Sequence, residues 1–303
     1  MQTAQQPVFK NAQDYIEFFR KGGEYYDTHQ LPGLMIGTRP DPQAMKVLGE
    51  ALLTDDDDVR DRIINLLRDI DRLNPPVYEL HTPEVIALMV GPGFAKMDSA
   101  RGKAMDLLRQ YASPSTLSRY EEAFLKALKE DPRGTDLRLI AKAKPKGAWE
   151  EVDRLSQLPE WNDRPDFREE IRIARAALGD TKIEDEYIAD AKQKEDAGDA
   201  EGLAESFDPL VQIGTRRTLQ AVCLRMRSPL IVNRKSHLES IRLAVMRALR
   251  YTFPEELEML DTGRIYEEKV YIRVEQFCTE RLGVSYGGMP RPEFFTMEQV
   301  ILR

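Results

Sequence analysis

A short pattern, in which an apolar residue is followed by arginine near the start of an amphipathic helix, recurs along most of this chain. It is found at Val59-Arg60, Ala100-Arg101, Leu137-Arg138, Ile171-Arg172 and Ile241-Arg242, with Ile272-Arg273 as a looser last member. Successive members lie 31 to 41 residues apart, except for one gap of 70 residues that is close to two periods. Recurrence at the length of one helix pair indicates a stacked helical array. This pattern constrains the architecture more than the activity.

The spacing of apolar residues predicts about seven antiparallel helix pairs between residues 41 and 282. In the first pair, Asp41 is placed to cap a helix and Pro42 lies in its first turn. An isolated pair could not bury its apolar stripe, whereas stacked neighbours bury it continuously. The later pairs are expected at 82–90 with 98–111, 115–129 with 135–142, 146–158 with 165–178, 181–193 with 199–213, 215–226 with 236–251, and 253–260 with 264–282.

Two segments resemble the second helix of a HEAT repeat. The first is Asp58-Val59-Arg60 with the apolar residues that follow it, and the second is Glu239-Ser240-Ile241-Arg242 before Ala244. The resemblance covers roughly residues 41–282, although the fifth unit, around 203–207, lacks the arginine. It implies an all-α, right-handed superhelical solenoid of the HEAT or armadillo type. Such scaffolds bind proteins or sometimes nucleic acids, and the resemblance implies no reaction.

The ends of the chain lie outside the predicted array and form two further regions. Residues 1–40 are expected to hold one helix, capped by Asn11 and ending at Gly22-Gly23, and then a loop of unusual length. The tail, residues 283–303, is expected to cover the exposed apolar face of the last repeat. A docking peptide for another chain is the alternative for this tail.

A basic stretch is the strongest feature that the array itself does not require. Residues 214–250 hold nine arginines and lysines but one acid, Glu239, in a chain whose net charge is −8. Pairing with the acidic residues of 184–208 inside the chain is the favoured interpretation of this charge. For a stretch that is free to bind a partner, we expect an acidic or phosphorylated protein surface, and a nucleic acid is the weaker alternative. The residues expected to contribute are Arg216, Arg217, Arg225, Arg227, Arg234 and Lys235.

No motif of catalysis, of cofactor binding or of metal binding is found in the sequence. The phosphate-binding loop, the nucleophile elbow and the dinucleotide fingerprint are absent, and His29, His81 and His237 are isolated. The acidic run 55–58 is interpreted as helix capping rather than as a cation site. We therefore expect neither a cofactor nor a metal.

The function predicted from the sequence is a non-catalytic protein-binding scaffold or adaptor. The alternative is an enzyme on a helical-repeat scaffold, such as a HEAT-like DNA glycosylase or a lyase-like repeat protein. A catalytic site of that kind would need a carboxylate and aromatic residues beside the basic stretch. The candidates for it are Tyr251, Phe253, Glu255 and Glu256.

Both cysteines, Cys223 and Cys278, lie inside apolar helical patterns, where a buried free thiol is the expected state. A disulfide or a reactive site is the alternative. With no apolar run long enough to cross a bilayer and no signal peptide in the sequence given, a cytoplasmic location is expected. A secreted or periplasmic chain whose leader has been removed stays an alternative.

Overall fold

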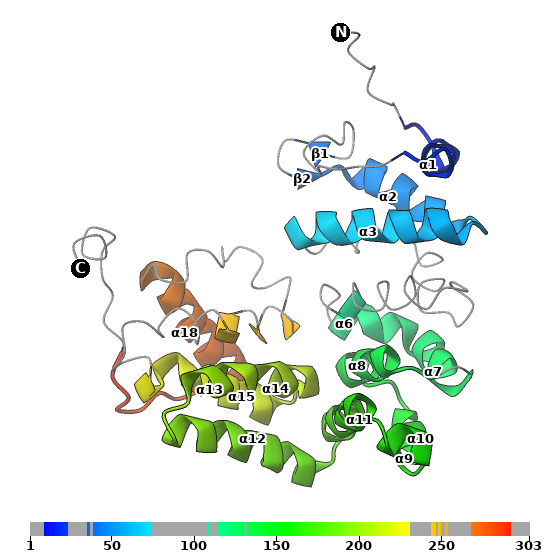
Figure 1. Ribbon diagram of the computed structural model, residues 1–303. Helices are drawn as coiled ribbons and strands as arrows, with labels where there is room; N and C mark the ends of the chain where they lie inside the picture. The colour runs from blue at the N-terminus through cyan, green and yellow to red at the C-terminus, as the bar shows by residue number, and fades with distance from the viewer. Residues whose placement is uncertain are drawn as a thin grey trace. The chain divides into compact units, whose positions relative to one another are not determined.

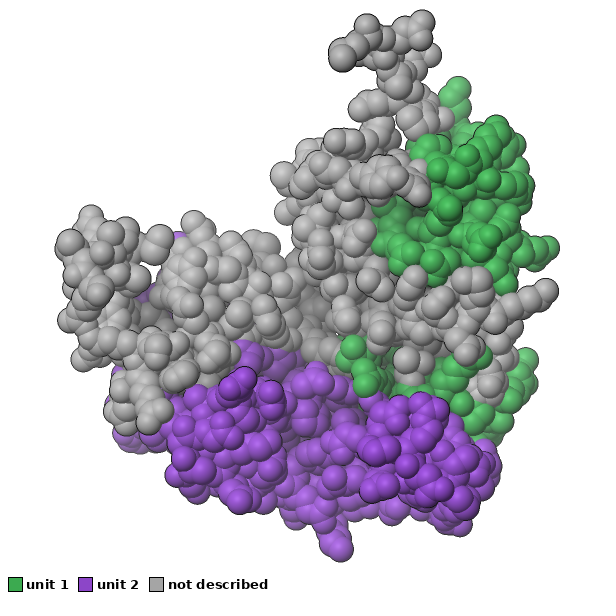
Figure 2. Space-filling model, viewed as in Figure 1, with its two compact units in different colours: residues 1–151 green, residues 152–303 purple. Residues whose placement is uncertain are grey.

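The computed structural model describes residues 9–23, 35–36, 39–73, 108–109, 114–130, 132–230, 244–246, 248–249, 252–253 and 268–291. The chain divides into two compact units, residues 1–151 and 152–303, which Figure 2 colours separately. Regular structure in the described residues is helical (Figure 1), apart from strands β1 (Met35–Ile36) and β2 (Arg39–Pro40), which pair antiparallel. The predicted all-α class is confirmed.

The first part of unit 1 is a small group of helices: α1 (Ala12–Arg20), α2 (Pro42–Glu50), the 3-10 turn η2 (Ala51–Leu53) and α3 (Asp57–Leu73). Asn11 accepts a hydrogen bond from the backbone of Asp14, and Asp41 accepts one from the backbone of Gln43. Both predicted caps are therefore confirmed. Helix α1 contacts α2, η2 and α3, and the core of this group is apolar apart from the buried Arg60, whose guanidinium donates to the carbonyl of Leu52.

The later part of unit 1 contains α6 (Pro114–Leu117), the 3-10 turn η4 (Ser118–Tyr120), α7 (Glu121–Glu130) and α8 (Gly134–Ala143). The sequence predicts one helix over 115–129, and the structure instead tightens into η4 between α6 and α7. There the Ser118 hydroxyl donates to the carbonyl of Ser115, a local bond that competes with regular helix bonding. Helix α9 (Ala148–Ser156) includes the boundary between the two units.

Unit 2 is a series of helices in which neighbours along the chain contact one another. They are α10 (Pro159–Asn162), α11 (Pro165–Ala177), α12 (Thr181–Asp196), α13 (Ala200–Glu205), α14 (Phe207–Ile213), α15 (Arg216–Leu224), the 3-10 turn η5 (Arg225–Arg227) and α18 (Glu268–Leu282). Helix α11 contacts both α12 and α14, while α15 contacts α14, α12 and α18. Each helix from α11 to α15 thus packs on more than one neighbour.

The prediction of one helix over 199–213 is wrong, because two helices meet at Ser206. Pro209 explains the break, since it lacks the N–H that would bond to the carbonyl of Glu205 and its ring crowds that carbonyl. Helix α14 ends at its C-cap residue Gly214, whose φ of 58° is in the left-handed region. The chain then enters α15 at the N-cap residue Thr215.

The described part of the tail, residues 283–291, lies against α15 and α18. Gly283 ends α18 in the left-handed conformation, with a φ of 71°, and turns the chain back. The Tyr286 hydroxyl donates to the carbonyl of Cys223, and the Val284 side chain is also buried. The remainder of the tail lies outside the described residues.

The expectation of two free buried thiols needs a correction. Both cysteines are fully buried, but Cys223 of α15 and Cys278 of α18 form a disulfide, with their Cα atoms 6.0 Å apart. The two residues are separated by 55 positions, so only the packing of α15 on α18 brings them together. Helical periodicity predicted their burial and contained no information about their pairing.

Several predicted elements lie outside the described residues. These are the helix at 82–90, most of 98–111, most of 236–251 and nearly all of 253–260. None of the helices in the described part of the chain is long and apolar enough to span a bilayer.

Candidate functional site

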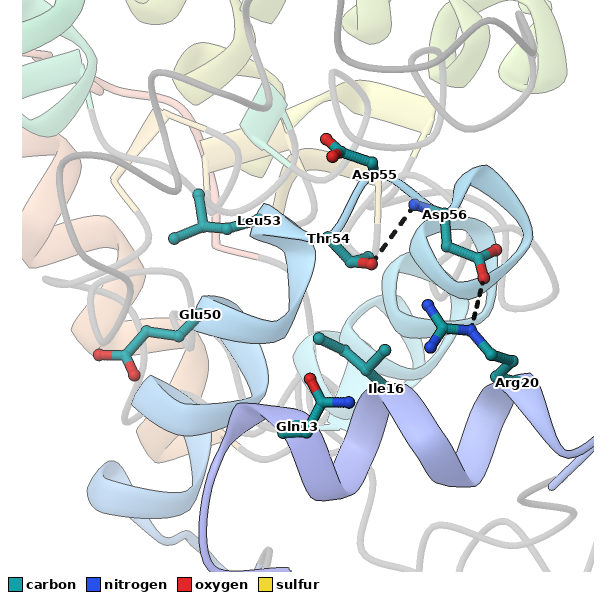
Figure 3. Close-up of a pocket in the computed structure, with 8 residues that line it drawn as sticks. All are labelled: Gln13, Ile16, Arg20, Glu50, Leu53, Thr54, Asp55 and Asp56. Atoms are coloured by element: carbon teal, nitrogen blue, oxygen red, sulfur yellow. Dashed lines mark hydrogen bonds and ion pairs between the residues drawn. The ribbon is translucent and has the colours of Figure 1, made fainter.

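An open groove lies where α1, the end of α2, η2 and the start of α3 meet (Figure 3). Its volume is about 670 Å³. Its lining residues are Gln13, Ile16 and Arg20 from α1, Glu50 from the end of α2, Leu53 from η2, and Thr54, Asp55 and Asp56 from the turn before α3. The groove is therefore built from two segments that are about 30 residues apart in sequence.

Leu53 is the exposed apolar residue of this groove. It is 49% exposed, whereas the adjacent Leu52 is fully buried. The 3-10 turn η2 has about three residues per turn rather than 3.6, so Leu53 is rotated away from the apolar stripe of α2. Ile16 of α1, which is half-buried, adds a second apolar side chain to the lining.

Asp56 holds one side of the groove in place. One of its carboxylate oxygens accepts a hydrogen bond from the backbone of Val59 at 3.2 Å, and so caps α3. The other oxygen accepts a bond from the Arg20 guanidinium at 3.1 Å. These bonds, first that from Arg20, lower the pKa of Asp56 below its usual value. The capping interpretation of the acidic run is confirmed at this residue.

The groove has a net negative charge. Its lining side chains include three carboxylates and one cation, and that cation, Arg20, is already paired with Asp56. Among the residues that the structure describes, Glu50 forms one ion pair, a long contact with Lys46 at 4.0 Å. Asp55 is exposed and forms no ion pair with another described residue. Two carboxylates are therefore directed to solvent beside an exposed leucine, an arrangement that suits a basic ligand with an apolar side chain.

The predicted basic stretch is largely engaged within the chain. Arg217 bonds to Glu184 at 2.9 Å and to Asp185 at 2.5 Å. The bond to Asp185, together with the charge of Glu184, raises the pKa of Arg217 above its usual value. Arg225, which is buried, lies 3.4 Å from Glu195. All three acids belong to α12, so the interpretation that the stretch pairs with the preceding acidic unit is confirmed for these two arginines.

Glu184 of α12 places its buried carboxylate beside the first turn of α15. Glu184 is 3% exposed, and its oxygens accept hydrogen bonds from Arg217 and from the hydroxyl of Thr215. Thr215 in turn accepts a bond from the backbone of Thr218, which makes it the N-cap of α15. Hydrogen bonds from Thr215 and Arg217 therefore join Glu184 of α12 to the start of α15.

Arg227 has a different partner, which the sequence did not reveal. Its guanidinium bonds to both oxygens of Glu275 in α18, at 2.5 and 3.2 Å, and to the carbonyl of Met289 at 2.7 Å. Arg291 bonds to the same carboxylate at 3.0 Å. Burial alone would raise the pKa of Glu275, but the bonds from Arg227 and Tyr271 outweigh it and lower that pKa below its usual value.

The six predicted residues therefore do not form one free surface. Arg217 and Arg225 contact α12, Arg227 contacts α18, and Arg216 donates to the carbonyl of Leu282 at 3.2 Å. Arg234 and Lys235 lie outside the described residues. A partner-binding role for these six residues stays a prediction.

The residues proposed for a catalytic alternative are mostly outside the described part, namely Tyr251, Glu255 and Glu256. Phe253 packs its ring against Phe277 of α18, with centroids 5.1 Å apart. Lys142 is buried, with 5% of its surface exposed, and this burial lowers its pKa. Its ammonium group donates a hydrogen bond to the carbonyl of Arg109. Within the described residues, no group of three or more His, Cys, Asp or Glu side chains is arranged to hold a metal.

No family model matches the chain, and no curated protein or solved structure matches it either. The HEAT-like interpretation therefore stays a prediction from the sequence.

Proposed function

We propose that this chain is a non-catalytic protein-binding scaffold, and that the groove between α1, η2 and α3 takes a short basic segment of a partner protein. The observation that carries the proposal is the half-exposed Leu53 beside the solvent-facing carboxylates of Glu50 and Asp55. A partner segment with one large apolar side chain between lysines or arginines would bury the leucine and pair with both acids.

The two parts of the groove make different contributions to such a complex. The carboxylates attract a basic segment and set its orientation, while contact with Leu53 and Ile16 removes apolar surface from water. The groove is open along the surface, which suits an extended chain segment better than a small molecule that must be enclosed. Arg20 is held by Asp56 and so does not oppose a cationic ligand at close range.

The scaffold itself is proposed to be a right-handed HEAT-like solenoid of about seven helix pairs. The successive contacts among α11, α12, α14 and α15 support this arrangement in unit 2. Each repeat in such an array contacts its neighbours and leaves side chains free along an extended surface. The array is then the support, and local surfaces such as the groove select the partner.

The test is a fluorescence-polarisation titration with a labelled peptide made of leucine, lysine and arginine. We expect the double variant Glu50→Gln with Asp55→Asn, and separately Leu53→Ser, to weaken binding by about tenfold, which corresponds to about 1.4 kcal/mol. A peptide with glutamate in place of each cation should not bind the wild-type chain.

Asp58→Asn is the matched control, because Asp58 is an exposed carboxylate of the same helix start that does not line the groove. It removes one charge from the same region, so a general electrostatic effect would weaken binding in this variant too. Equal losses for Asp58→Asn and for the groove variants would refute the assignment of the site.

A further inference from the structure

One face of α15 and η5 is directed toward α18 and the tail. Arg216, Gln220, Cys223 and Arg227 are spaced four, three and four residues apart, and so lie on one side of the helix. All four contact α18 or residues 283–291. This face is distinct from the one on which Arg217 and Arg225 contact α12.

The cover, which consists of α18 and residues 283–291, presents hydrogen-bond acceptors to the donors of this face. The carbonyl of Leu282 accepts bonds from Arg216 at 3.2 Å and from Gln220 at 2.7 Å. Arg227 is met by the carboxylate of Glu275 and by the carbonyl of Met289. The covering group is therefore a carboxylate flanked by backbone carbonyls, which is the chemistry that an acidic peptide would offer.

A disulfide holds this cover in place. Cys223 lies in the middle of the face, and its bond to Cys278 ties α15 to α18. The side chain of Tyr286 is buried and donates to the carbonyl of Cys223, so the tail contacts the bridged position as well. Apart from this bridge, η5 and α18 are joined covalently through residues 228–267 of the chain.

The loop closed by the disulfide is long enough for its loss to matter. For a separation of 55 residues, chain entropy predicts that reduction raises the equilibrium constant for detachment by up to about 1,000-fold. Without the bridge, the cover is held by non-covalent contacts. These are the bonds of Glu275 with Arg227 and Arg291, and the packing of the buried apolar side chains of α18 and of residues 283–291.

We propose that the Cys223–Cys278 disulfide is a redox latch, whose reduction by a dithiol lets α18 and residues 283–291 leave α15 and opens the Arg216–Arg227 face to an acidic peptide of a partner protein. Two electrons from the dithiol cleave the S–S bond. Each cysteine sulfur gains a proton, and the dithiol becomes a disulfide. Because both sulfurs are fully buried, attack follows transient opening of the cover.

The charge of the uncovered face favours an acidic occupant. Release of Glu275 leaves Arg227 without its carboxylate and Arg216 without its carbonyl, and both cations then lie on one helix face. An acidic peptide replaces the lost carboxylate and carbonyl acceptors. This partner is opposite in charge to the basic segment proposed for the groove. Failure of the groove to bind a basic peptide would therefore leave the binding of an acidic peptide to α15 unaffected.

The first experiment measures hydrogen exchange of the full chain before and after dithiothreitol treatment. We expect faster exchange in residues 268–291 after reduction, while α11 and α12 keep their protection and serve as an internal reference. The variant Cys278→Ala should exchange like the reduced protein with or without dithiothreitol. Unchanged exchange in 268–291, or two free thiols in denatured protein prepared without reductant, would overturn the proposal.

The second experiment titrates a labelled oligoglutamate peptide. Binding is expected for the reduced protein and for Cys278→Ala, and not for the oxidised protein. Arg227→Gln should weaken binding to the reduced protein by about tenfold, which is the loss of one charge-assisted contact. Arg164→Gln, which removes an exposed arginine far from α15 in sequence, is the matched control and should have no effect. Detachment without peptide binding would also overturn the proposal.

Discussion

The buried carboxylate of Glu275 accepts two hydrogen bonds from the guanidinium of Arg227, across 48 residues of sequence. Arg291 adds a third bond from the tail. One carboxylate of α18 therefore contacts both the end of η5 and residues 283–291, and its ion pairs add to the disulfide in holding this end of unit 2.

The pKa of Glu275 makes this end sensitive to acid. Because the folded-state pKa lies below the usual 4.5, ionised Glu275 stabilises the fold above pH 4.5, and the stabilisation is lost as the pH falls through the lower folded-state value. We expect protection of residues 268–291 against hydrogen exchange to fall in that range. Glu275→Gln should abolish the pH dependence there, and an unchanged profile in this variant would contradict the account.

Asp56 has two separable roles, as the cap of α3 and as the partner of Arg20. Asp56→Ala removes both and is expected to destabilise the start of α3 by about 1 kcal/mol. Asp56→Asn keeps a capping oxygen and loses only an exposed ion pair, so its cost should be smaller. Hydrogen exchange of the first-turn amides of α3 measures both effects. Equal losses for the two variants would show that the cap contributes little.

Thr215 joins the cap of α15 to the buried Glu184. Thr215→Val keeps the shape of the side chain but removes both the cap and one donor to that carboxylate. We expect a loss of about 2 to 3 kcal/mol in the free energy of unfolding, measured by urea titration. Thr181→Val, at an exposed position in the first turn of α12, is the control and should cost much less.

Local features were predicted well from the sequence. The caps Asn11 and Asp41 and the helices that follow them depend on residues within one turn, so their signals are visible in the chain itself. Helical periodicity does not predict the break at Ser206, because the apolar pattern of 199–213 continues across Pro209. The proline itself is the signal that indicates this break.

Long-range contacts were not predictable in the same way. Glu275 is one acid within an apolar helical pattern, and nothing near it in sequence points to Arg227. The Cys223–Cys278 pair is equally distant. The groove depends on the rotation of Leu53 by a 3-10 turn, whereas helical periodicity assigned that leucine to the end of an apolar helix.

The most direct test of the central claim is an NMR titration of the labelled chain with the peptide of leucine, lysine and arginine. The account predicts amide shift changes concentrated in Gln13–Arg20 of α1, in Glu50–Asp56 and in the first turn of α3, and reduced changes in Leu53→Ser. Changes confined to other helices, or none at peptide concentrations that saturate binding, would contradict it.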